Sequence, residues 1–273
     1  MAVSLQEIEC FVFDMDGTIN LGNTLIPGSL ELIEALKKQH KEFYFFTNNS
    51  SRSPEAYIQK LTHLGFTDIT RRHIMTSGDV MIHYLKTHFG TAPTIYLAGT
   101  PELEKQFRRA GIKLLCSGST ESPDAVVLAF DTTFNFEKAT TMCRMISAGA
   151  PFLATNIDKV CPLEAGAYLP DCGSMCKMIT HATGVEAKFV GKPFQETVAY
   201  ILNTSGSDPR KTAIVGDRLY TDIATATAGG IIGIAVLSGE VTLEDIQAQQ
   251  EIHPDYILNS VADILSTLTL RKG

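Results

Sequence analysis

The sequence predicts an α/β fold with two units, each built on a parallel sheet. Short, continuous apolar runs recur along the chain, as expected for strands that are buried on both faces. Amphipathic stretches lie between these runs and supply helices to cover the sheets. The apolar runs outnumber the strands of one average sheet, so the pattern indicates a second unit.

Eleven apolar runs are the candidate strands. They lie at residues 10–13, 43–46, 73–76, 94–99, 112–116, 125–130, 152–155, 187–191, 212–216, 233–237 and 255–259. In residues 29–38 and 55–65, apolar side chains recur at three- and four-residue spacing, which is the period of an amphipathic helix. Gly65 ends the second of these predicted helices.

The composition and charge narrow the classes of function. Of the 273 residues, 44% are hydrophobic and 19% are charged, which excludes a disordered chain and is typical of one that buries a core. The 23 Lys and Arg residues against 30 Asp and Glu residues give a formal net charge of −7. This argues against a nucleic-acid binder, which usually carries a basic face. An anionic substrate would need local positive groups or a metal ion to overcome the overall field.

The N-terminal residues do not have the pattern of a signal peptide. They contain no basic segment, and Glu7 and Glu9 interrupt the apolar run. No stretch of the sequence approaches the roughly 20 apolar residues of a membrane helix. We therefore expect a cytoplasmic protein.

The six cysteines are scattered and do not form the pattern of a disulfide framework. Ordinary buried or helical cysteines are the main interpretation. The alternative is a zinc site formed by Cys161, Cys172, Cys176 and His181.

The first motif that can carry chemistry follows the apolar run 10–13. Asp14 and Asp16 are two residues apart in extended chain, so both side chains can face one cavity at the carboxyl end of a strand. Ligands bind at that end of open α/β sheets. Paired carboxylates suit a divalent cation, or a nucleophile beside a general acid. The alternative is a polar turn completed by Gly17 and Thr18.

The second motif follows the run 43–46 and contains Thr47, Asn48 and Asn49. Hydroxyl and amide groups just before a helix, together with the free N–H groups of the helix start, can bind an anion. The alternative is an ordinary helix cap, with Ser53 before Pro54 in the first turn.

Two further motifs also follow apolar runs. Lys192 lies between Gly191 and Pro193, so its backbone is more restricted than that of most surface lysines, and it could supply local positive charge. Asp217 follows the run 212–216 at the position that Asp14 holds after its own strand. Asp222 lies five residues further on, where a helix cap or a partner of the helix dipole is the alternative interpretation.

The four motifs together place Asp-x-Asp, Thr, Lys and Asp at four strand ends. In this combination the chain resembles the haloacid dehalogenase (HAD) superfamily of phosphatases. The spacing is similar to that of its NagD-like, p-nitrophenylphosphatase and pyridoxal phosphatase branch, and the stretches 47–49, 154–156 and 190–193 support that likeness. The resemblance implies a Rossmann-like core with an inserted α/β cap of the C2 type.

The resemblance also implies a role for each motif. Asp14 would attack phosphorus and form an aspartyl-phosphate, and Asp16 would protonate the leaving group and then activate water. Phosphoryl oxygens would be held by Thr47 and Lys192, with Asn48 and Asn49 beside them. An acid at Asp16 argues against dehalogenation, because the dehalogenases of the superfamily lack it.

Magnesium is the cofactor that the resemblance implies. The ligands of Mg²⁺ would be the Asp14 carboxylate, the backbone carbonyl of Asp16 and Asp217, with Asp222 nearby as support. Positive charge from Mg²⁺ and Lys192 would offset the repulsion between a carboxylate nucleophile and a phosphate dianion.

The long gap between Asn49 and Lys192 is where the resemblance places the cap. We expect the core at residues 1–88 and 186–273 and the cap at 89–185. Candidate cap contacts to substrate are Asp131, Asn156 and Cys161. The pyridoxal phosphatases carry a histidine where this chain has Cys161, which argues against pyridoxal phosphate as the substrate.

The function expected is a Mg²⁺-dependent phosphatase for small phosphomonoesters, such as p-nitrophenyl phosphate, sugar phosphates or nucleoside monophosphates. The alternatives are a phosphotransferase or phosphomutase on the same scaffold and a non-catalytic regulator that binds phosphate or metal. The expected partners are a small phosphorylated metabolite and a second copy of the chain bound through the cap. Neither nucleic acid nor a membrane is expected.

Overall fold

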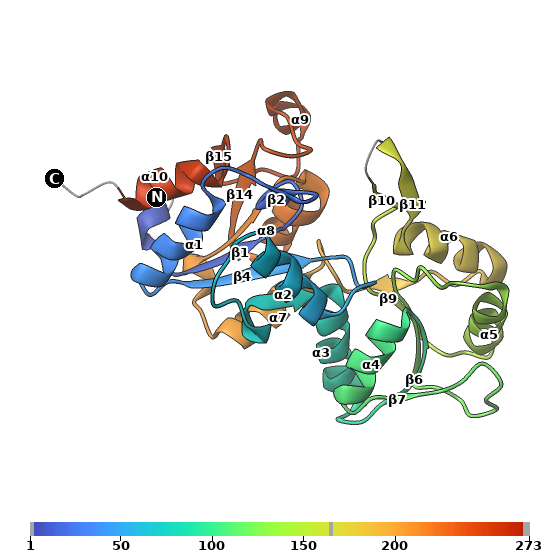
Figure 1. Cartoon of the computed structure of the whole chain (residues 1–273). Helices are drawn as coiled ribbons and strands as arrows, with labels where there is room; N and C mark the ends of the chain where they lie inside the picture. Colours follow the sequence, from blue (N-terminus) through green and yellow to red (C-terminus); the bar gives the residue numbers. More distant parts are fainter. Residues whose placement is uncertain (1–2, 164–165, 270–273) are drawn as a thin grey trace. The chain divides into compact units, whose positions relative to one another are not determined.

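The computed structural model describes residues 3–163 and 166–269, and the chain forms two compact units (Figure 1). The first unit contains the residues up to Thr47, Tyr57–Met75 and the residues from Lys192 onward. The second unit consists of Asn48–Ala56 and Thr76–Gly191. The second unit is therefore inserted into the first.

The first unit is built on a six-stranded sheet with the order β15-β14-β13-β1-β4-β5. In that order the strands are Tyr256–Leu258, Ile232–Val236, Thr212–Gly216, Cys10–Phe13, Glu42–Thr47 and Ile74–Thr76. β1 pairs in parallel with β13 and with β4, so Phe13 lies beside Val215 and Phe45. Because neighbouring parallel strands end at one edge, the residues that follow β1, β4 and β13 come together there.

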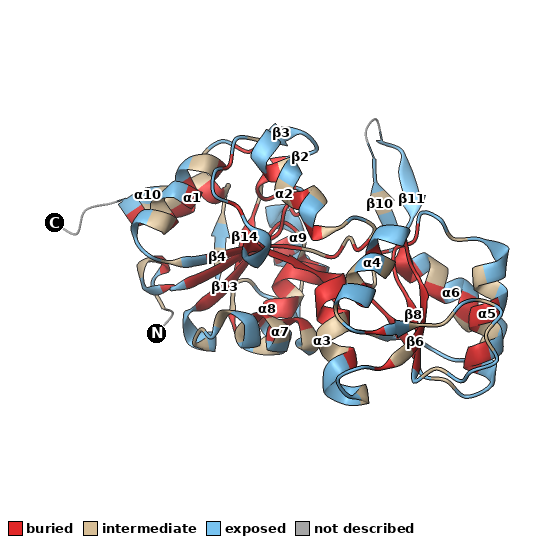
Figure 2. Ribbon diagram, turned by 60° about the horizontal axis from the view of Figure 1, so that its bottom comes forward, coloured by how far each residue is buried: buried red, intermediate tan, exposed pale blue. Residues whose placement is uncertain are grey.

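Helices cover both faces of this sheet because its central strands are apolar on both faces. The helices are α1 (Ser29–Lys38), α2 (Pro54–His63), α7 (Gln195–Ser205), α8 (Ala224–Gly229), α9 (Leu243–Ala248) and α10 (Val261–Thr269). Figure 2 shows α1 and α10 on one face and α7 and α8 on the other, with buried strands between them. Aliphatic and aromatic side chains form the core, and the rings of Phe11 and Phe13 stack with centroids 5.9 Å apart.

The second unit is built on a five-stranded parallel sheet with the order β12-β9-β8-β6-β7. In that order the strands are Lys188–Phe189, Phe152–Ala154, Ala125–Leu128, Thr94–Ala98 and Lys113–Leu114. Its helices are α3 (Ser77–Phe89), α4 (Pro101–Arg109), α5 (Phe136–Ser147) and α6 (Cys172–Thr183). An antiparallel hairpin joins β10 (Val160–Pro162) to β11 (Tyr168–Pro170).

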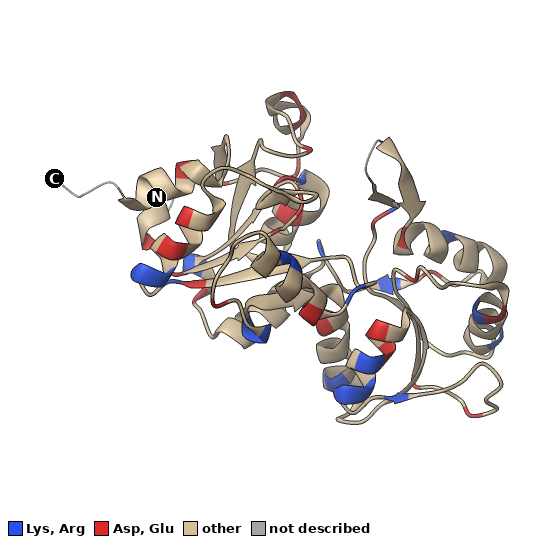
Figure 3. Cartoon of the chain, in the orientation of Figure 1, with Lys and Arg blue, Asp and Glu red and all other residues tan. Residues whose placement is uncertain are grey.

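Helix α4 shows how charge placement supports local structure in the second unit. The Thr100 hydroxyl caps its N-terminus. Glu102 and Glu104 lie in the first turn and Arg108 and Arg109 in the last, so acidic and basic side chains separate along the helix (Figure 3). Both the cap and this charge order complement the helix dipole.

The structure confirms the predicted α/β class and the two sheets. Each of the eleven apolar runs overlaps a strand of one of the two parallel sheets. The helices predicted at 29–38 and 55–65 correspond to α1 and α2. The sequence pattern missed the hairpin β10–β11 and a second one, β2 (Asn20–Leu21) with β3 (Thr24–Leu25), because strands of two or three residues show no periodicity.

The inserted unit is longer than the segment 89–185 that the sequence indicated. It includes α3, because Gln106 of α4 donates from Nε2 to Asp79 Oδ1 of α3 at 2.7 Å. It includes β12, because that strand pairs with β9. It also includes residues 48–56, where the Ser51 carbonyl accepts a hydrogen bond from Thr100 Oγ1 at 3.0 Å.

None of the six cysteines, all of which lie in the described residues, forms a disulfide bond. Cys172 and Cys176 lie one turn apart in α6, buried, with their sulfur atoms 4.0 Å apart. The hydrogen bond between these thiols and their burial raise the pKa of Cys176. Across residues 3–163 and 166–269, the side chains that could jointly hold a metal ion are three aspartates and include no cysteine.

In the described part of the chain, no helix combines the length and the apolar character that crossing a membrane requires.

Packing in the second unit can be tested with two phenylalanines of very different exposure. Phe107 is 0% exposed and Phe136 is 88% exposed. We expect Phe107→Ala to lower the free energy of unfolding by about 3–5 kcal/mol, because it leaves a cavity. Phe136→Ala is the matched control and should change it by less than about 0.5 kcal/mol. Urea unfolding of both variants measures the difference, and equal effects would contradict this description of the core.

Candidate active site

The candidate site lies where β1, β4 and β13 end. Asp14 follows β1, Thr47 is the last residue of β4, and Asp217 follows β13. The Asp14 backbone N–H donates to the Val215 carbonyl at 2.8 Å, which continues the pairing of β1 with β13 to the site. The sheet thus brings Asp14 and Asp217, 203 positions apart (217 − 14) in the sequence, into one acidic group.

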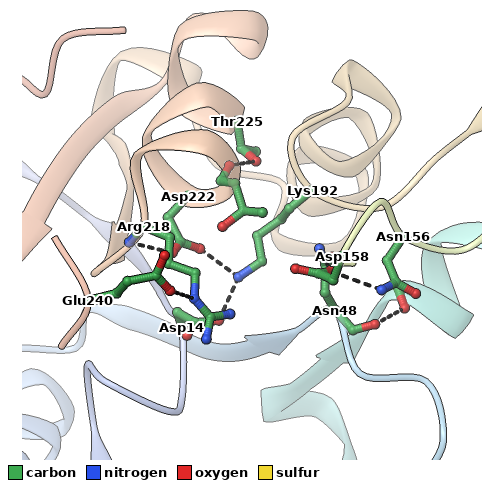
Figure 4. Close-up of polar contacts among 11 residues, drawn as sticks. Asp14, Asn48, Asn156, Asp158, Lys192, Arg218, Asp222, Thr225 and Glu240 are labelled. Atoms are coloured by element: carbon green, nitrogen blue, oxygen red, sulfur yellow. Dashed lines mark hydrogen bonds and ion pairs between the residues drawn. The ribbon is translucent and has the colours of Figure 1, made fainter. Parts of the chain in front are cut away.

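Lys192 is the buried cation of this group. Its side chain is only 2% exposed, and Nζ donates to Asp14 Oδ1 and to Asp222 Oδ1, both at 2.6 Å (Figure 4). Nζ also lies 5.2 Å from the centre of the Phe46 ring. Burial alone would lower the pKa of Lys192, but the two carboxylates outweigh it and raise the pKa, so the ammonium stays charged.

Three carboxylates gather around this cation. Oxygen atoms of Asp14, Asp217 and Asp222 lie within 4.8 Å of one another, and all three residues are buried. Burial and the charge of Asp14 raise the pKa of Asp217 to about 6. Burial also raises the pKa of Asp222 to about 7, with Asp14 and Asp217 adding to it and Lys192 opposing it. The site therefore holds more negative charge than its own lysine balances.

Two glycines make room for Asp217. Gly17 has a φ of 94°, which disfavours other residues, and a Cβ there would overlap the Asp217 carboxylate. A Cβ at Gly239 would overlap the same carboxylate. The backbone of two loops therefore approaches the Asp217 carboxylate closely. This close approach explains why a glycine follows Asp16.

Arg218 and Glu240 belong to the site and were missed in the sequence. Arg218 Nε donates to Glu240 Oε2 at 2.8 Å, and the Glu240 backbone N–H donates to Asp217 Oδ2 at 2.8 Å (Figure 4). Burial alone would lower the pKa of Arg218, but Asp14 and Asp217 outweigh it and raise the pKa. The only available signal was that Arg218 is next to Asp217, since Glu240 lies in a distant loop.

The Asp16 side chain is exposed, unlike the three buried carboxylates of the acidic group. Its exposed fraction is 59%, and Oδ1 accepts hydrogen bonds from Lys60 Nζ at 3.0 Å and from Asn20 Nδ2 at 2.6 Å. The cluster of three carboxylates does not include it. This position suits a group that exchanges protons with solvent, and it leaves the backbone carbonyl as the part of Asp16 expected to bind metal.

Asn48 and Asn49 lie in the second unit, one and two residues beyond Thr47. Asn48 Nδ2 donates to Asp158 Oδ2 at 2.9 Å, and Asn49 Nδ2 lies 3.9 Å from Cys161 Sγ. The structure thus gives both asparagines, and Cys161, partners within that unit.

The other two candidate cap residues are also buried and hydrogen-bonded. Asp131 Oδ2 pairs with Lys138 Nζ at 2.5 Å. Asn156 Nδ2 donates to Asp158 and to Asp171, at 2.9 and 3.0 Å. Their side chains therefore stabilise the second unit, and a contact of either with substrate stays a prediction.

The residues present fit a divalent cation. Within the described residues, Asp217 Oδ1 is a buried atom without a hydrogen-bond partner, although buried carboxylate oxygens nearly always have one. It belongs to the group of three carboxylates, and hard oxygen ligands of this kind are what Mg²⁺ binds. A cation there would give Asp217 Oδ1 its missing partner and offset the excess negative charge.

Comparison with known proteins identifies the relatives of this chain. The family of haloacid dehalogenase-like hydrolases matches residues 11–113, and a HAD-hydrolase-like family matches residues 189–264. A glycerol-3-phosphate phosphatase of Gallus gallus is 31% identical, and the alignment covers 97% of this chain and 93% of the relative.

Solved structures agree with the sequence comparison. A 4-nitrophenylphosphatase from Thermotoga maritima is 37% identical with a TM-score of 0.90, over 97% of this chain and 99% of the other. A glycerol phosphate phosphatase from Mycobacterium tuberculosis, solved in complex with magnesium, is 30% identical with a TM-score of 0.86, over 98% and 78% of the two chains.

The raised pKa of Asp217 makes a prediction about stability without metal. Because the folded pKa is about 6, keeping Asp217 ionised costs folding free energy as the pH rises from about 4 through about 6. An asparagine carries no such cost. The stability of Asp217→Asn relative to the parent protein should therefore increase over this range and stay level above it.

Urea unfolding in a chelating buffer at several pH values measures this difference. Asp68→Asn, at an exposed position of the first unit, is the control for removing one carboxylate, and its free energy of unfolding should stay within about 0.5 kcal/mol of the parent value. A difference between Asp217→Asn and the parent that does not vary with pH would contradict the raised pKa.

Proposed function

Because the chain belongs to the haloacid dehalogenase-like hydrolases, we propose that it is a Mg²⁺-dependent phosphatase for small phosphomonoesters. The observation that carries this proposal is the buried Lys192 ammonium between Asp14 and Asp222, together with Asp217, whose buried Oδ1 has no hydrogen-bond partner among the described residues. A carboxylate, a fixed cation and a cation-binding cluster at one sheet edge are what phosphoryl transfer requires. The relatives named above act on glycerol phosphate and 4-nitrophenyl phosphate, and both compounds are small phosphomonoesters.

Asp14 is the nucleophile in this proposal. An Asp14 carboxylate oxygen forms a bond to phosphorus while the bond from phosphorus to the ester oxygen breaks, giving an aspartyl-phosphate and the alcohol. Water then attacks phosphorus and releases Asp14 and inorganic phosphate. Lys192 Nζ keeps its positive charge beside Asp14 and so reduces the repulsion between the carboxylate and the phosphate dianion.

Asp16 is the proton donor and acceptor. It gives its proton to the departing ester oxygen and later takes a proton from the attacking water. Its exposed ion pair with Lys60 contributes little free energy, so exchanging that partner for substrate costs little. Thr47, at the end of β4, supplies the hydroxyl group that binds a phosphoryl oxygen.

Mg²⁺ would be held by Asp14, Asp217 and the backbone carbonyl of Asp16, with Asp222 in support. When bound, the ion supplies positive charge to the phosphoryl oxygens. Arg218 and Glu240 orient Asp217 through the Glu240 backbone N–H. The cytoplasmic location and a homodimer through the inserted unit stay predictions.

The first test of this proposal is hydrolysis by the parent protein and by Asp14→Asn. The parent should release phosphate from p-nitrophenyl phosphate and glycerol 3-phosphate with Mg²⁺ and not with a chelator. Asp14→Asn should remove turnover, because the amide does not attack phosphorus, and should still fold, because Lys192 keeps Asp222. Asp68→Asn is the exposed control and should keep full activity. Turnover by a folded Asp14→Asn protein would contradict the role of Asp14.

The second test concerns the leaving group. Asp16→Asn should reduce hydrolysis of glycerol 3-phosphate far more than that of p-nitrophenyl phosphate, because an alkoxide needs a proton and p-nitrophenolate hardly does. General acid catalysis is worth roughly 10²–10⁴-fold, which sets the size of the gap. A burst of p-nitrophenol before slow turnover would mark a trapped aspartyl-phosphate.

Lys60→Met is the matched control for the second test, because it removes the ion-pair partner of Asp16 and leaves the carboxyl group in place. It should retain the activity of the parent on both substrates within a few-fold. Equal losses of Asp16→Asn on both substrates, without a burst, would show that Asp16 only shapes the turn.

A further inference from the structure

The segment after Thr47 is fixed inside the second unit, although Thr47 itself ends a strand of the first. The Ser50 hydroxyl lies 3.2 Å from Thr155 Oγ1 and accepts a hydrogen bond from the Phe130 backbone N–H at 3.2 Å. The Ser51 carbonyl accepts one from Thr100. The backbone that leaves the proposed phosphate-binding residue is thus held by three segments of the inserted unit.

Asn48 forms hydrogen bonds within the second unit through both its backbone and its side chain. Its backbone carbonyl accepts a hydrogen bond from Ser77 Oγ at 2.6 Å. A Cβ at Gly191 would lie 3.0 Å from Asn48 Oδ1 and would overlap the Thr155 carbonyl oxygen, so only glycine fits there. Asn48 directly follows Thr47, and Gly191 directly precedes Lys192. Thr47 and Lys192, two of the residues proposed to bind phosphate, are therefore each directly bonded to a residue of the same packed cluster.

The buried carboxylate of Asp158 accepts hydrogen bonds from two asparagines of this cluster. Its Oδ2 accepts hydrogen bonds from Asn48 Nδ2 and from Asn156 Nδ2, both at 2.9 Å (Figure 4). Asn156 is fully buried, and it uses its second N–H on Asp171 Oδ1 and its oxygen on the Thr155 hydroxyl. Buried networks of this kind favour one geometry, because each lost partner leaves a desolvated polar group.

We propose that Asp158 is a positioning residue for phosphate binding, which acts by holding Asn48 and the chain segments that carry Thr47 and Lys192. This proposal rests on the proposed phosphatase function. Asp158 acts through Asn48 and the backbone, without contact to the reacting atoms. Its removal should therefore weaken the binding of phosphate groups more than it slows the chemical step.

The test compares Asp158→Ala with the parent protein. The measurements are kcat and KM for p-nitrophenyl phosphate, the Kd of inorganic phosphate by calorimetry with Mg²⁺ present, and thermal unfolding. We expect KM and the Kd of phosphate to rise together by about tenfold, the equivalent of one hydrogen bond to a charged group, with a smaller change in kcat. Asp158→Asn keeps an oxygen acceptor for Asn48 and should restore most of the binding.

Asp171→Ala is the matched control. Asp171 is also a buried carboxylate that accepts a hydrogen bond from Asn156, and it caps α6. This variant should lose thermal stability, because alanine cannot cap the helix, while both binding constants stay within about twofold of the parent values. If Asp171→Ala weakens phosphate binding as much as Asp158→Ala does, the effect is general loss of stability and the proposal is wrong.

Unchanged KM and Kd in folded Asp158→Ala would also overturn the proposal. If the alanine variant does not fold, Asp158→Ser replaces it, because serine keeps a polar group but is too short to reach Asn48. A parent protein that binds phosphate but hydrolyses nothing would contradict the phosphatase function alone. The Kd values of the variants would still decide the role of Asp158.

Discussion

The ion pairs of the buried Lys192 ammonium group with Asp14 and Asp222 are the interaction on which the site depends. Burying three carboxylates at one sheet edge is costly, as the raised pKa values of Asp217 and Asp222 show. Lys192 offsets part of that cost at two of the three groups, at 2.6 Å each. Breaking a buried pair of this kind typically costs about 3–5 kcal/mol, because one charge is left without a partner. The same pairs hold the Asp14 carboxylate in place, which supports its proposed role as the nucleophile.

The sequence predicted the members of this group that follow apolar runs. Asp14 and Asp217 each come directly after a buried strand, and Lys192 follows a strand closely, so the local pattern was enough to place them at strand ends. Parallel pairing then brings such ends together without any further information. Asp222 was ambiguous, because a carboxylate at a helix start is more often a cap. Its burial and its bond to Lys192 assign it to the acidic group.

The residues that the sequence did not predict depend on contacts between distant segments. Glu240 reaches Asp217 and Arg218 from a loop that shows no periodic pattern. The bond between Asn48 and Asp158 joins residues 110 positions apart, and no local signal marks either one as a partner of the other. The limits of the inserted unit were misplaced for the same reason, because hydrogen bonds rather than composition assign residues 48–56 to it.

The charges of the site also explain how an acidic protein can bind a phosphate ester. Four carboxylates, those of Asp14, Asp217, Asp222 and Glu240, surround two cations, Lys192 and Arg218, so the formal charge of the group is −4 + 2 = −2. A phosphate dianion would meet net repulsion from this group, in addition to the overall charge of −7. One divalent cation brings the group to zero, and the partnerless Asp217 Oδ1 marks where positive charge is missing. The binding of metal and phosphate is therefore coupled by electrostatics, because the carboxylates at the strand ends repel a phosphate dianion unless a cation is bound.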